Sequence, residues 1–335
     1  MYQFDPIQTL ANVDYSRADT FGERACSLSR LMSKGYRIPY GVVISTKVFK
    51  KFLNTIPGTK RIDHLMDQIN WENLDETALE IQDIILRSPV PMSMKNQIAE
   101  EIYRLLDRIE SKSVVIRTSA HVEDSSRHVC FGRGVFFHLK DIREILNLMK
   151  NCWASAFTPD VLKDLIQAGL PPDNVNIAVI IEEMITARTS GILIVKKESI
   201  SGEGDVQIRA NWGSQVYEEN NGIYCDQIIV NEKKIGEPIE IYRSYKEKIS
   251  CIPEDTKRTM IIENKPEKKV ALSVSEQNIG TLIQLARKIQ KDFEVDYEIE
   301  FIFDHNDSLW LLDAIPKSGR RGYYHIGHSS KHPIK

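Results

Sequence analysis

A short segment in the first half of the chain combines residue types that can bind phosphate. The apolar run at residues 114–116 predicts a short buried strand. Arg117, Thr118 and Ser119 follow it directly. A guanidinium and two hydroxyls fixed at the end of a buried strand can donate hydrogen bonds to phosphate oxygens. The same pattern is equally typical of a strand end with a solvated arginine followed by a helix cap.

Two nearby features extend the chemistry of this segment. Glu123 and Asp124 place two carboxylates a few residues after Arg117. The following segment contains Gly132 and Gly134, whose conformational freedom allows a backbone to approach an anion closely. Phosphate donors, a flexible loop and nearby carboxylates together indicate nucleotide chemistry.

Composition bounds the class of protein. The 335 residues, 42% hydrophobic and 27% charged, are typical of a soluble globular protein with two or three lobes. A net charge of -3 favours neither a nucleic acid nor a membrane partner. No apolar run approaches the roughly 20 residues of a membrane helix, and the first residues lack the pattern of a signal peptide. The five cysteines are scattered without CxxC spacing, so we expect reduced thiols, a cytoplasmic location and no zinc site.

Helical and strand-like patterns occupy different halves of the chain. Apolar residues at helical spacing predict helices at residues 21–34, 75–88, 94–109, 142–156 and 159–168, with another after Thr46. Short β-rich runs dominate from residue 176, at residues 177–181, 191–195, 206–210, 227–230, 239–242, 297–303 and 309–314. One amphipathic helix is expected at residues 275–293, and the charged stretch 245–269 is expected to be an exposed excursion.

This order predicts an α+β fold. We expect a helix-rich N-terminal lobe over residues 1–185 and a sheet-rich C-terminal lobe over residues 186–316. Residues 317–335 are expected to form a basic tail or the remnant of a linker.

Seven segments carry a resemblance to a known family. Residues 22–44 are similar without a gap to the pattern GGKGANLARLxxAGxPVPPGFVV, and residues 115–124 to AVRSSATAED. The other similar segments are 152–157 to CWASLF, 179–185 to VVVQRMV, 190–194 to AGVLF, 298–301 to DIEW and 311–316 to LLQARP. Their order and spacing resemble the nucleotide-binding region of the pyruvate phosphate dikinase, phosphoenolpyruvate synthase and rifampicin phosphotransferase family.

The resemblance implies an ATP-grasp-like fold whose lobes enclose a nucleotide cleft, with ATP and Mg²⁺ as cofactors. It implies that Arg117 holds the transferring phosphate and that Arg24 stands in for the family's glycine-loop lysine. Arginine keeps the charge of lysine but presents a wide planar fork. Both residues are expected to be catalytic and, together with Thr118, to bind nucleotide. Gly132 and Gly134 fall in the phosphate-loop region.

The resemblance also implies a hinge and a metal site. Glu182 and Met184 fall in the hinge between the lobes, where backbone groups would bind adenine and Met184 would pack on the ring. Glu300 aligns with the family's metal-binding glutamate. Asp313 replaces a glutamine, and its carboxylate is a good ligand for Mg²⁺.

Each of these positions also has a plain structural interpretation. Arg117 is compatible with a structural ion pair, Arg24 with a surface helix position and Met184 with ordinary core packing. Strand alternation sets Glu300 apart from its apolar neighbours, which fits a cleft-facing or a solvated carboxylate. Asp313 lies on an alternating strand in the same way.

Departures from the family pattern leave several functions open. Ile315 occupies the place of a second arginine, and the family's GLGE acid has no clear counterpart near residues 212–216. The leading expectation is a stand-alone ATP-dependent phosphotransferase. In the family the β-phosphate of ATP passes to a histidine, which implies a separate histidine-bearing protein or a small-molecule acceptor. One alternative is a catalytically degenerate nucleotide-binding regulatory or scaffold subunit, and another is a direct small-molecule kinase.

Overall fold

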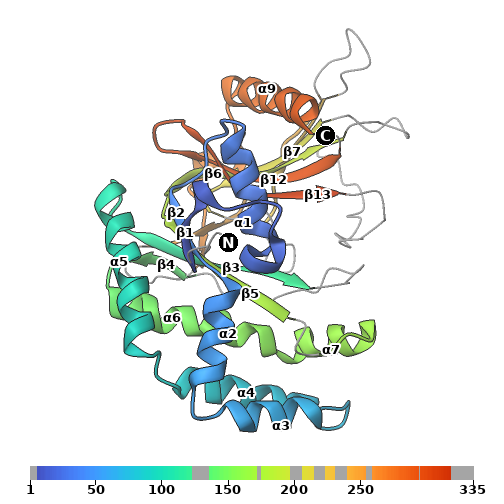
Figure 1. Ribbon diagram of the computed structural model, residues 1–335. Coiled ribbons are helices and arrows are strands. Elements are labelled where there is room, and N and C mark those ends of the chain that lie inside the picture. The colour runs from blue at the N-terminus through green and yellow to red at the C-terminus, as the bar shows by residue number, and fades with distance from the viewer. Residues whose placement is uncertain are drawn as a thin grey trace.

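Two antiparallel sheets form the framework of the protein (Figure 1). The structure is a computed structural model that describes residues 6–122, 136–171, 175–196, 206–214, 223–230, 240–253, 259–293 and 295–317. The first sheet has the strand order β1 (Ile7–Thr9), β2 (Gly41–Ile44), β5 (Val175–Glu183), β3 (Val114–Val122) and β4 (Phe136–Leu139). The second has the order β13 (Leu309–Lys317), β12 (Asp296–Asp304), β6 (Ala187–Val195), β7 (Val206–Trp212), β8 (Asp226–Val230) and β9 (Glu240–Tyr242).

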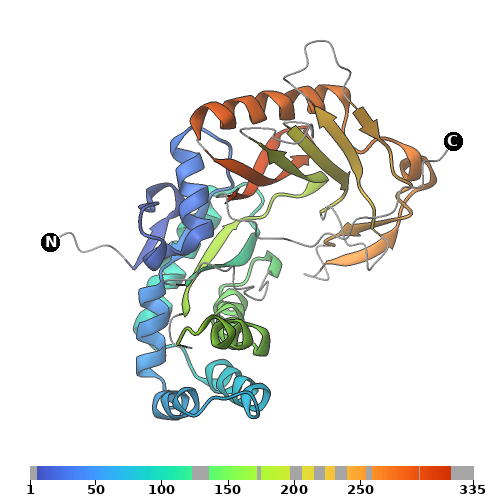
Figure 2. The ribbon, with the colours of Figure 1, turned by 90° about the vertical axis from the view of Figure 1, so that its right-hand side faces the viewer.

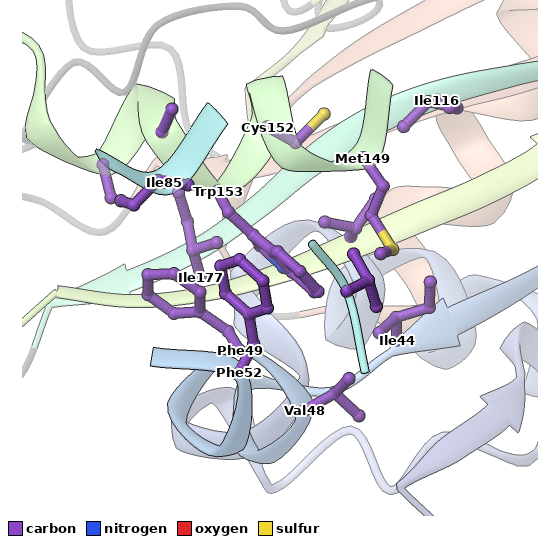
Figure 3. Packing of buried hydrophobic residues seen from close by; sticks show 14 of the residues in the cluster. Ile44, Val48, Phe49, Phe52, Ile85, Ile116, Met149, Cys152, Trp153 and Ile177 are labelled. Atoms are coloured by element: carbon purple, nitrogen blue, oxygen red, sulfur yellow. The ribbon is translucent and has the colours of Figure 1, made fainter. Parts of the chain in front are cut away.

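One face of the first sheet packs against a group of helices. These are α2 (Thr46–Thr55), α3 (Thr59–Asp67), α4 (Leu74–Arg87), α5 (Met92–Arg108), α6 (Ile142–Ala154) and α7 (Pro159–Ala168), with a 3-10 turn at Ser155–Phe157. Figure 3 shows the centre of this core, where Trp153 of α6 packs against Phe49 and Phe52 of α2. The ring centroids of these two pairs lie 5.8 and 4.7 Å apart. This aromatic cluster anchors the helical layer beneath the sheet.

A second core joins the two sheets. It contains apolar residues of α1 (Ala18–Ser33) and of α9 (Glu276–Asp292). Helix α9 lies on one face of the second sheet (Figure 2). Helix α1 packs on β3 and β5 of the first sheet and on β13 of the second. The first sheet also contributes Val43 and Ile180, and a short 3-10 turn at Leu10–Asn12 precedes α1. Thus α1, although early in the chain, lies in the core that the two sheets share.

The expected α+β class is confirmed, with an N-terminal part rich in helices and a C-terminal part rich in strands. The chain passes from the first sheet to the second between Glu183 and Ala187. The division into domains at residue 185 stays a prediction, and α1 packs with both sheets. No helix within the described residues is both long and apolar enough to cross a bilayer.

The strand that carries Arg117 is longer than expected. The sequence predicts its end at residue 116, but β3 pairs with β5 from Val114 opposite Glu183 to Val122 opposite Val175. Hydrogen bonding to a long neighbouring strand extends β3 past its apolar run, which no local pattern reveals. Arg117 therefore lies within the strand, and its neighbours alternate between the two faces of the sheet.

The charged stretch 245–269 is only partly the exposed excursion that the sequence predicts. It holds the hairpin β10 (Lys248–Cys251) and β11 (Met260–Glu263), followed by α8 (Pro266–Val270). All four residues of β11 are exposed, but Lys246 is fully buried. Its ammonium is paired with Asp226 of β8 at 2.6 Å, and this partner explains the burial of a residue type that is usually solvated.

Candidate functional site

Five charged residues from five different elements meet between the two sheets. We call them the charged cluster: Arg24 of α1, Arg117 of β3, Glu182 of β5, Glu300 of β12 and Asp313 of β13. The first three precede the crossing between the sheets, and the last two follow it. The cluster is the place where charges from the two halves of the chain are in direct contact.

A glycine at the start of α1 positions Arg24. Gly22 has φ +75°, and any side chain there would collide with the backbone carbonyl of Ser119 on β3. This close approach lets the Ser119 hydroxyl donate to the carbonyl of Phe21 (2.9 Å) and accept from the amide of Ala25 (3.0 Å). The beginning of α1 is thereby fixed on the strand that carries Arg117.

Arg24 links the first sheet to the last strand. Its Nε donates to Oδ2 of Asp313 at 2.8 Å, and its Nη1 donates to the backbone carbonyl of Thr118 at 2.7 Å. A guanidinium with both sides engaged has a fixed orientation. Arg24 is therefore not a free surface residue of the helix.

Arg117 is buried at the centre of the cluster. Its Nη1 donates to Oε1 of Glu182 at 3.2 Å and to the carbonyl of Leu312 at 2.6 Å. Its Nη2 donates to Oε2 of Glu300 at 3.3 Å and lies 3.9 Å from Oδ2 of Asp313. One guanidinium thus contacts both sheets.

An irregularity in β13 provides one of these contacts. Glu300 pairs with Asp313, but the next residue, Phe301, pairs with Leu311, so Leu312 has no partner in the ladder. An extra residue of this kind re-aims local backbone groups, and such bulges are frequent beside active sites. Here the carbonyl of Leu312 accepts a hydrogen bond from Arg117.

Burial and neighbouring charges shift the pKa values of Glu182, Asp313 and Arg117 in opposite directions. Burial raises the pKa of Glu182, and the nearby Arg117 does not offset that effect. Burial also acts to raise the pKa of Asp313, but the charges of Arg24 and Arg117 outweigh it and hold the pKa below its usual value. Burial acts to lower the pKa of Arg117, and the three carboxylates raise it instead. Arg117 therefore stays charged at all ordinary pH values.

The cluster has more carboxylates than guanidiniums. Three acids face two arginines, and Oε2 of Glu182 is buried without a hydrogen-bond partner among the residues that the structure describes. The carboxylate of Glu300 is the most accessible of the three, with 42% of its side chain exposed. A buried polar atom without a partner costs free energy. An excess of negative charge and an accessible carboxylate fit the approach of a cation.

The structure brings the two expected metal ligands together. Glu300 and Asp313 lie directly opposite each other on neighbouring strands, so their side chains share a face. Oδ1 of Asp313 accepts from the amide of Ala314 and Oδ2 accepts from Arg24, so both its oxygens are engaged. Within the described residues, no group of three or more His, Cys, Asp or Glu side chains is placed to hold a metal. The metal role of the pair stays a prediction.

Thr118 does not join the cluster through its side chain. In β3 the faces alternate, and Ile116 packs in the helical core while Arg117 points to the second sheet. Thr118 therefore lies on the helix-facing side and is buried there. Its backbone carbonyl takes part instead, as the acceptor for Arg24.

The expected hinge residues lie where the chain crosses between the sheets. The amide of Glu183 donates to the carbonyl of Tyr40 at 2.7 Å, and that of Met184 donates to the carbonyl of Ser113 at 2.9 Å. Met184 itself is buried. These two amides are already used within the protein, and the proposed contact with adenine stays a prediction.

Several predicted residues lie outside the described part of the chain. These are Gly132 and Gly134 of the expected phosphate loop, the acids Glu123 and Asp124, and the tail after Lys317.

Two contributions to the cluster were not predicted. The carboxylate of Glu182 was assigned to the hinge only through its backbone, although a glutamate after an apolar run is a signal for a buried charge. The carbonyl of Leu312 carries no sequence signal, because a bulge depends on the pairing of two distant strands.

Comparison with known proteins identifies the family. Residues 18–322 match the family described as "Pyruvate phosphate dikinase, AMP/ATP-binding domain". A probable phosphoenolpyruvate synthase of Archaeoglobus fulgidus is 26% identical over 317 residues, covering 93% of this chain and 41% of the relative. A rifampicin phosphotransferase of Bacillus cereus is 23% identical over 300 residues, covering 88% of this chain and 34% of the relative.

Solved structures are more distant. An N5-carboxyaminoimidazole ribonucleotide synthetase in complex with ADP aligns over 94% of this chain and 54% of its own, with 10% identity and a TM-score of 0.39, too low to support an argument. The chain spans about two fifths of the length of the curated relatives it matches. On the extent of the family match, the chain belongs to the pyruvate phosphate dikinase AMP/ATP-binding domain family.

Proposed function

We propose that this protein binds ATP with Mg²⁺ in the charged cluster and transfers a phosphoryl group from it. The observation that supports this most strongly is the meeting of Arg24 and Arg117 with Glu300 and Asp313 across the two sheets. Phosphoryl transfer depends mainly on positioning and on stabilising the charge of phosphate oxygens. Fixed guanidiniums beside the accessible carboxylate of Glu300 are suited to that task.

The arginines would bind phosphate oxygens. Arg117 is held from three sides, so its guanidinium is already oriented when a ligand arrives. Arg24 is fixed by the carbonyl of Thr118 and would turn its remaining donors to the same ligand. Such preorganisation avoids the cost of ordering long side chains during the reaction.

The carboxylates of Glu300 and Asp313 fit Mg²⁺ in their chemistry, because Mg²⁺ prefers oxygen ligands. The excess of acids over arginines and the orphaned oxygen of Glu182 support a cation in this region. Glu300 would hold the ion, and Asp313 would exchange its contact with Arg24 for it. Mg²⁺ bound there would neutralise charge on the phosphate oxygens.

The acceptor is proposed to be a histidine on a separate protein or a small molecule. Support comes from the names of relatives, which include phosphoenolpyruvate synthases and rifampicin phosphotransferases. We also propose that the protein acts in the cytoplasm. The described cysteines Cys26, Cys225 and Cys251 are free thiols, which is usual in a reducing compartment.

A transfer experiment tests this function. The protein is incubated with Mg²⁺, ATP and a candidate histidine-bearing protein or small molecule. Nucleotide products are quantified, and the intact mass of the acceptor is measured. We expect ATP loss with a matching gain of one phosphoryl group on the acceptor. Background turnover with every acceptor, despite tight ATP binding, would contradict a transferase.

A second candidate is a nucleotide-binding subunit that regulates or scaffolds a partner. The observation in its favour is that carboxylates already neutralise both arginines. Ile315, on the same strand as Asp313, also offers no contact to phosphate. Saturable ATP binding without turnover, together with a nucleotide-dependent affinity for a partner protein, would favour this function over the first.

A further inference from the structure

A third arginine lies in line with the carboxylates of the charged cluster. In the second sheet, Asp313 pairs with Glu300, Glu300 with Ile192, and Ile192 with Arg209. Directly paired residues in antiparallel strands project from the same face of a sheet. The four side chains therefore form one row across β13, β12, β6 and β7.

The row projects from the face of the second sheet that is opposite to its apolar core. Ile208 and Ala210, the neighbours of Arg209, are fully buried in the second core on the opposite face. Arg209 must therefore point away from that core. Glu300 and Asp313, in the same row, contact Arg117 and Arg24.

The surroundings of Arg209 do not satisfy its charge. Its paired neighbours on the two flanking strands are Ile192 and Gln227, which carry no charge. In the described part of the chain, no hydrogen bond or ion pair of the Arg209 side chain is found, although the residue is half-buried. A partly desolvated guanidinium without a carboxylate favours an anionic ligand. Arg24 and Arg117, in contrast, are both paired with acids.

The row has carboxylates at one end and, at the other, a guanidinium that has no partner among the described residues. Strands lie about 4.8 Å apart, so the backbone of Arg209 is roughly 10 Å from that of Glu300, two strands away. A long side chain and a phosphate group together span that separation. A cation on the carboxylates and phosphate oxygens on the arginine would match this distribution of charge.

We propose that Arg209 is a further binding residue of the nucleotide site and that it contacts the phosphate chain of ATP beside the cation held by Glu300. The assignment rests on the proposed ATP-binding function and adds a residue of β7 to it. Arg209 would approach the phosphates from the side of the row opposite to Arg117, so the chain of phosphates would lie between two guanidiniums.

Calorimetric titration with a series of nucleotides tests the assignment. Wild-type protein, Arg209→Gln, Arg209→Lys and Arg87→Gln are titrated with ATP, ADP, AMP and adenosine in the presence of Mg²⁺. Arg87 is a matched control because it lies on α4 in an exposed ion pair with Asp83. Thermal unfolding of each variant checks that it is folded.

We expect Arg209→Gln to weaken ATP binding about 10-fold or more, because a charged hydrogen bond is lost. Adenosine affinity should not change, Arg209→Lys should lose less than Arg209→Gln, and Arg87→Gln should match wild type. Equal ATP affinity in wild type and Arg209→Gln would overturn the assignment while leaving the proposed function intact. An equal loss for adenosine and ATP would also overturn it, since the residue would then not recognise phosphate. If wild type binds no nucleotide, the proposed function fails and this assignment fails with it.

Discussion

The charged cluster between the sheets and a buried ion pair beside the second sheet differ in how completely their charges are satisfied. The ammonium of Lys246 donates to Oδ1 of Asp226 at 2.6 Å and to the carbonyl of Ser244 at 2.8 Å. The other carboxylate oxygen of Asp226 accepts from the amide and the hydroxyl of Ser273, both at 2.7 Å. Lys246 and Asp226, which we call the sealed pair, are 0% exposed.

The charged cluster is open by comparison. It has one more acid than arginine, an orphaned oxygen on Glu182 and an accessible carboxylate on Glu300. The sealed pair has no hydrogen-bonding group left for a ligand among the described residues. Its contacts hold the segment before β10 and the loop before α9 against β8. A structural ion pair has all its hydrogen-bonding groups paired, whereas a binding site has unpaired groups that solvent or a ligand can reach. Burial alone does not distinguish the two.

The largest effect should come from breaking the sealed pair. Lys246→Met leaves the carboxylate of Asp226 buried without its cation, so we expect the free energy of unfolding to fall by about 3–5 kcal/mol. Urea denaturation measures this. The double variant Lys246→Met/Asp226→Asn should recover part of the loss. A decrease below about 1 kcal/mol would mean that the pair behaves like an exposed one.

A large change in the Mg²⁺ dependence of ATP binding is expected from a substitution at Glu300. Glu300→Gln removes the most accessible carboxylate, so the gain in ATP affinity on adding Mg²⁺ should shrink by about 10-fold. Calorimetry at a series of Mg²⁺ concentrations measures it. Glu298→Gln is the matched control, because Glu298 lies on the same strand face and pairs with Lys317 at 3.1 Å. An equal effect of both variants would point to general surface charge instead.

A moderate, pH-dependent effect is expected for Asp313. The pKa of Asp313 is lowered in the folded protein, where Arg24 and Arg117 outweigh the effect of burial. Its contribution to stability is therefore present above the unfolded pKa and is lost as pH falls through the folded pKa. Asp313→Asn should cost about 1–3 kcal/mol at neutral pH. That cost should shrink in denaturation series carried to about pH 3, and a constant cost would refute the ionic origin.

The smallest effect should come from Glu182, as a change in how steeply the free energy of unfolding depends on pH. Burial raises its pKa, so the folded state holds a proton more tightly than the unfolded chain. Stability from this group is full below the unfolded pKa and is lost as pH rises through the folded pKa. In Glu182→Gln that decline should be absent, as measured by denaturation between about pH 4 and pH 8. If the free energy of unfolding of Glu182→Gln fell with pH as steeply as that of wild type, the pKa of Glu182 would not be raised in the folded protein.

The sequence predicts the elements of the fold better than it predicts their contacts. Helix α9 was expected at residues 275–293 and runs from Glu276 to Asp292, because Ser275 caps it and its apolar stripe is regular. Helix α3 was not expected, and the predicted strand at β3 ended too early, at residue 116. The length of β3 depends on β5, more than 50 residues later, which a local pattern does not contain.

The candidate site shows the same division. Arg117 was singled out by its place after a buried strand, and Arg24, Glu300 and Asp313 by the family resemblance; the structure brings all four together. The side-chain role of Thr118 was not supported, because it depended on where the strand ended. Lys246 was assigned to an exposed stretch because lysine-rich segments are usually solvated, and its partner Asp226 is distant in sequence. Arg209 became a candidate only through the register of four strands.

The central claim is that the charged cluster binds ATP with Mg²⁺ through guanidiniums from one half of the chain and carboxylates from the other. Calorimetric titration of Mg²⁺ and ATP into wild type and Arg117→Ala tests it most directly. We expect saturable binding to wild type and affinity about 10–100-fold weaker in the variant, since charged hydrogen bonds worth about 1.5–3 kcal/mol are lost. The absence of binding to wild type, or equal affinity in a folded Arg117→Ala, would contradict the claim.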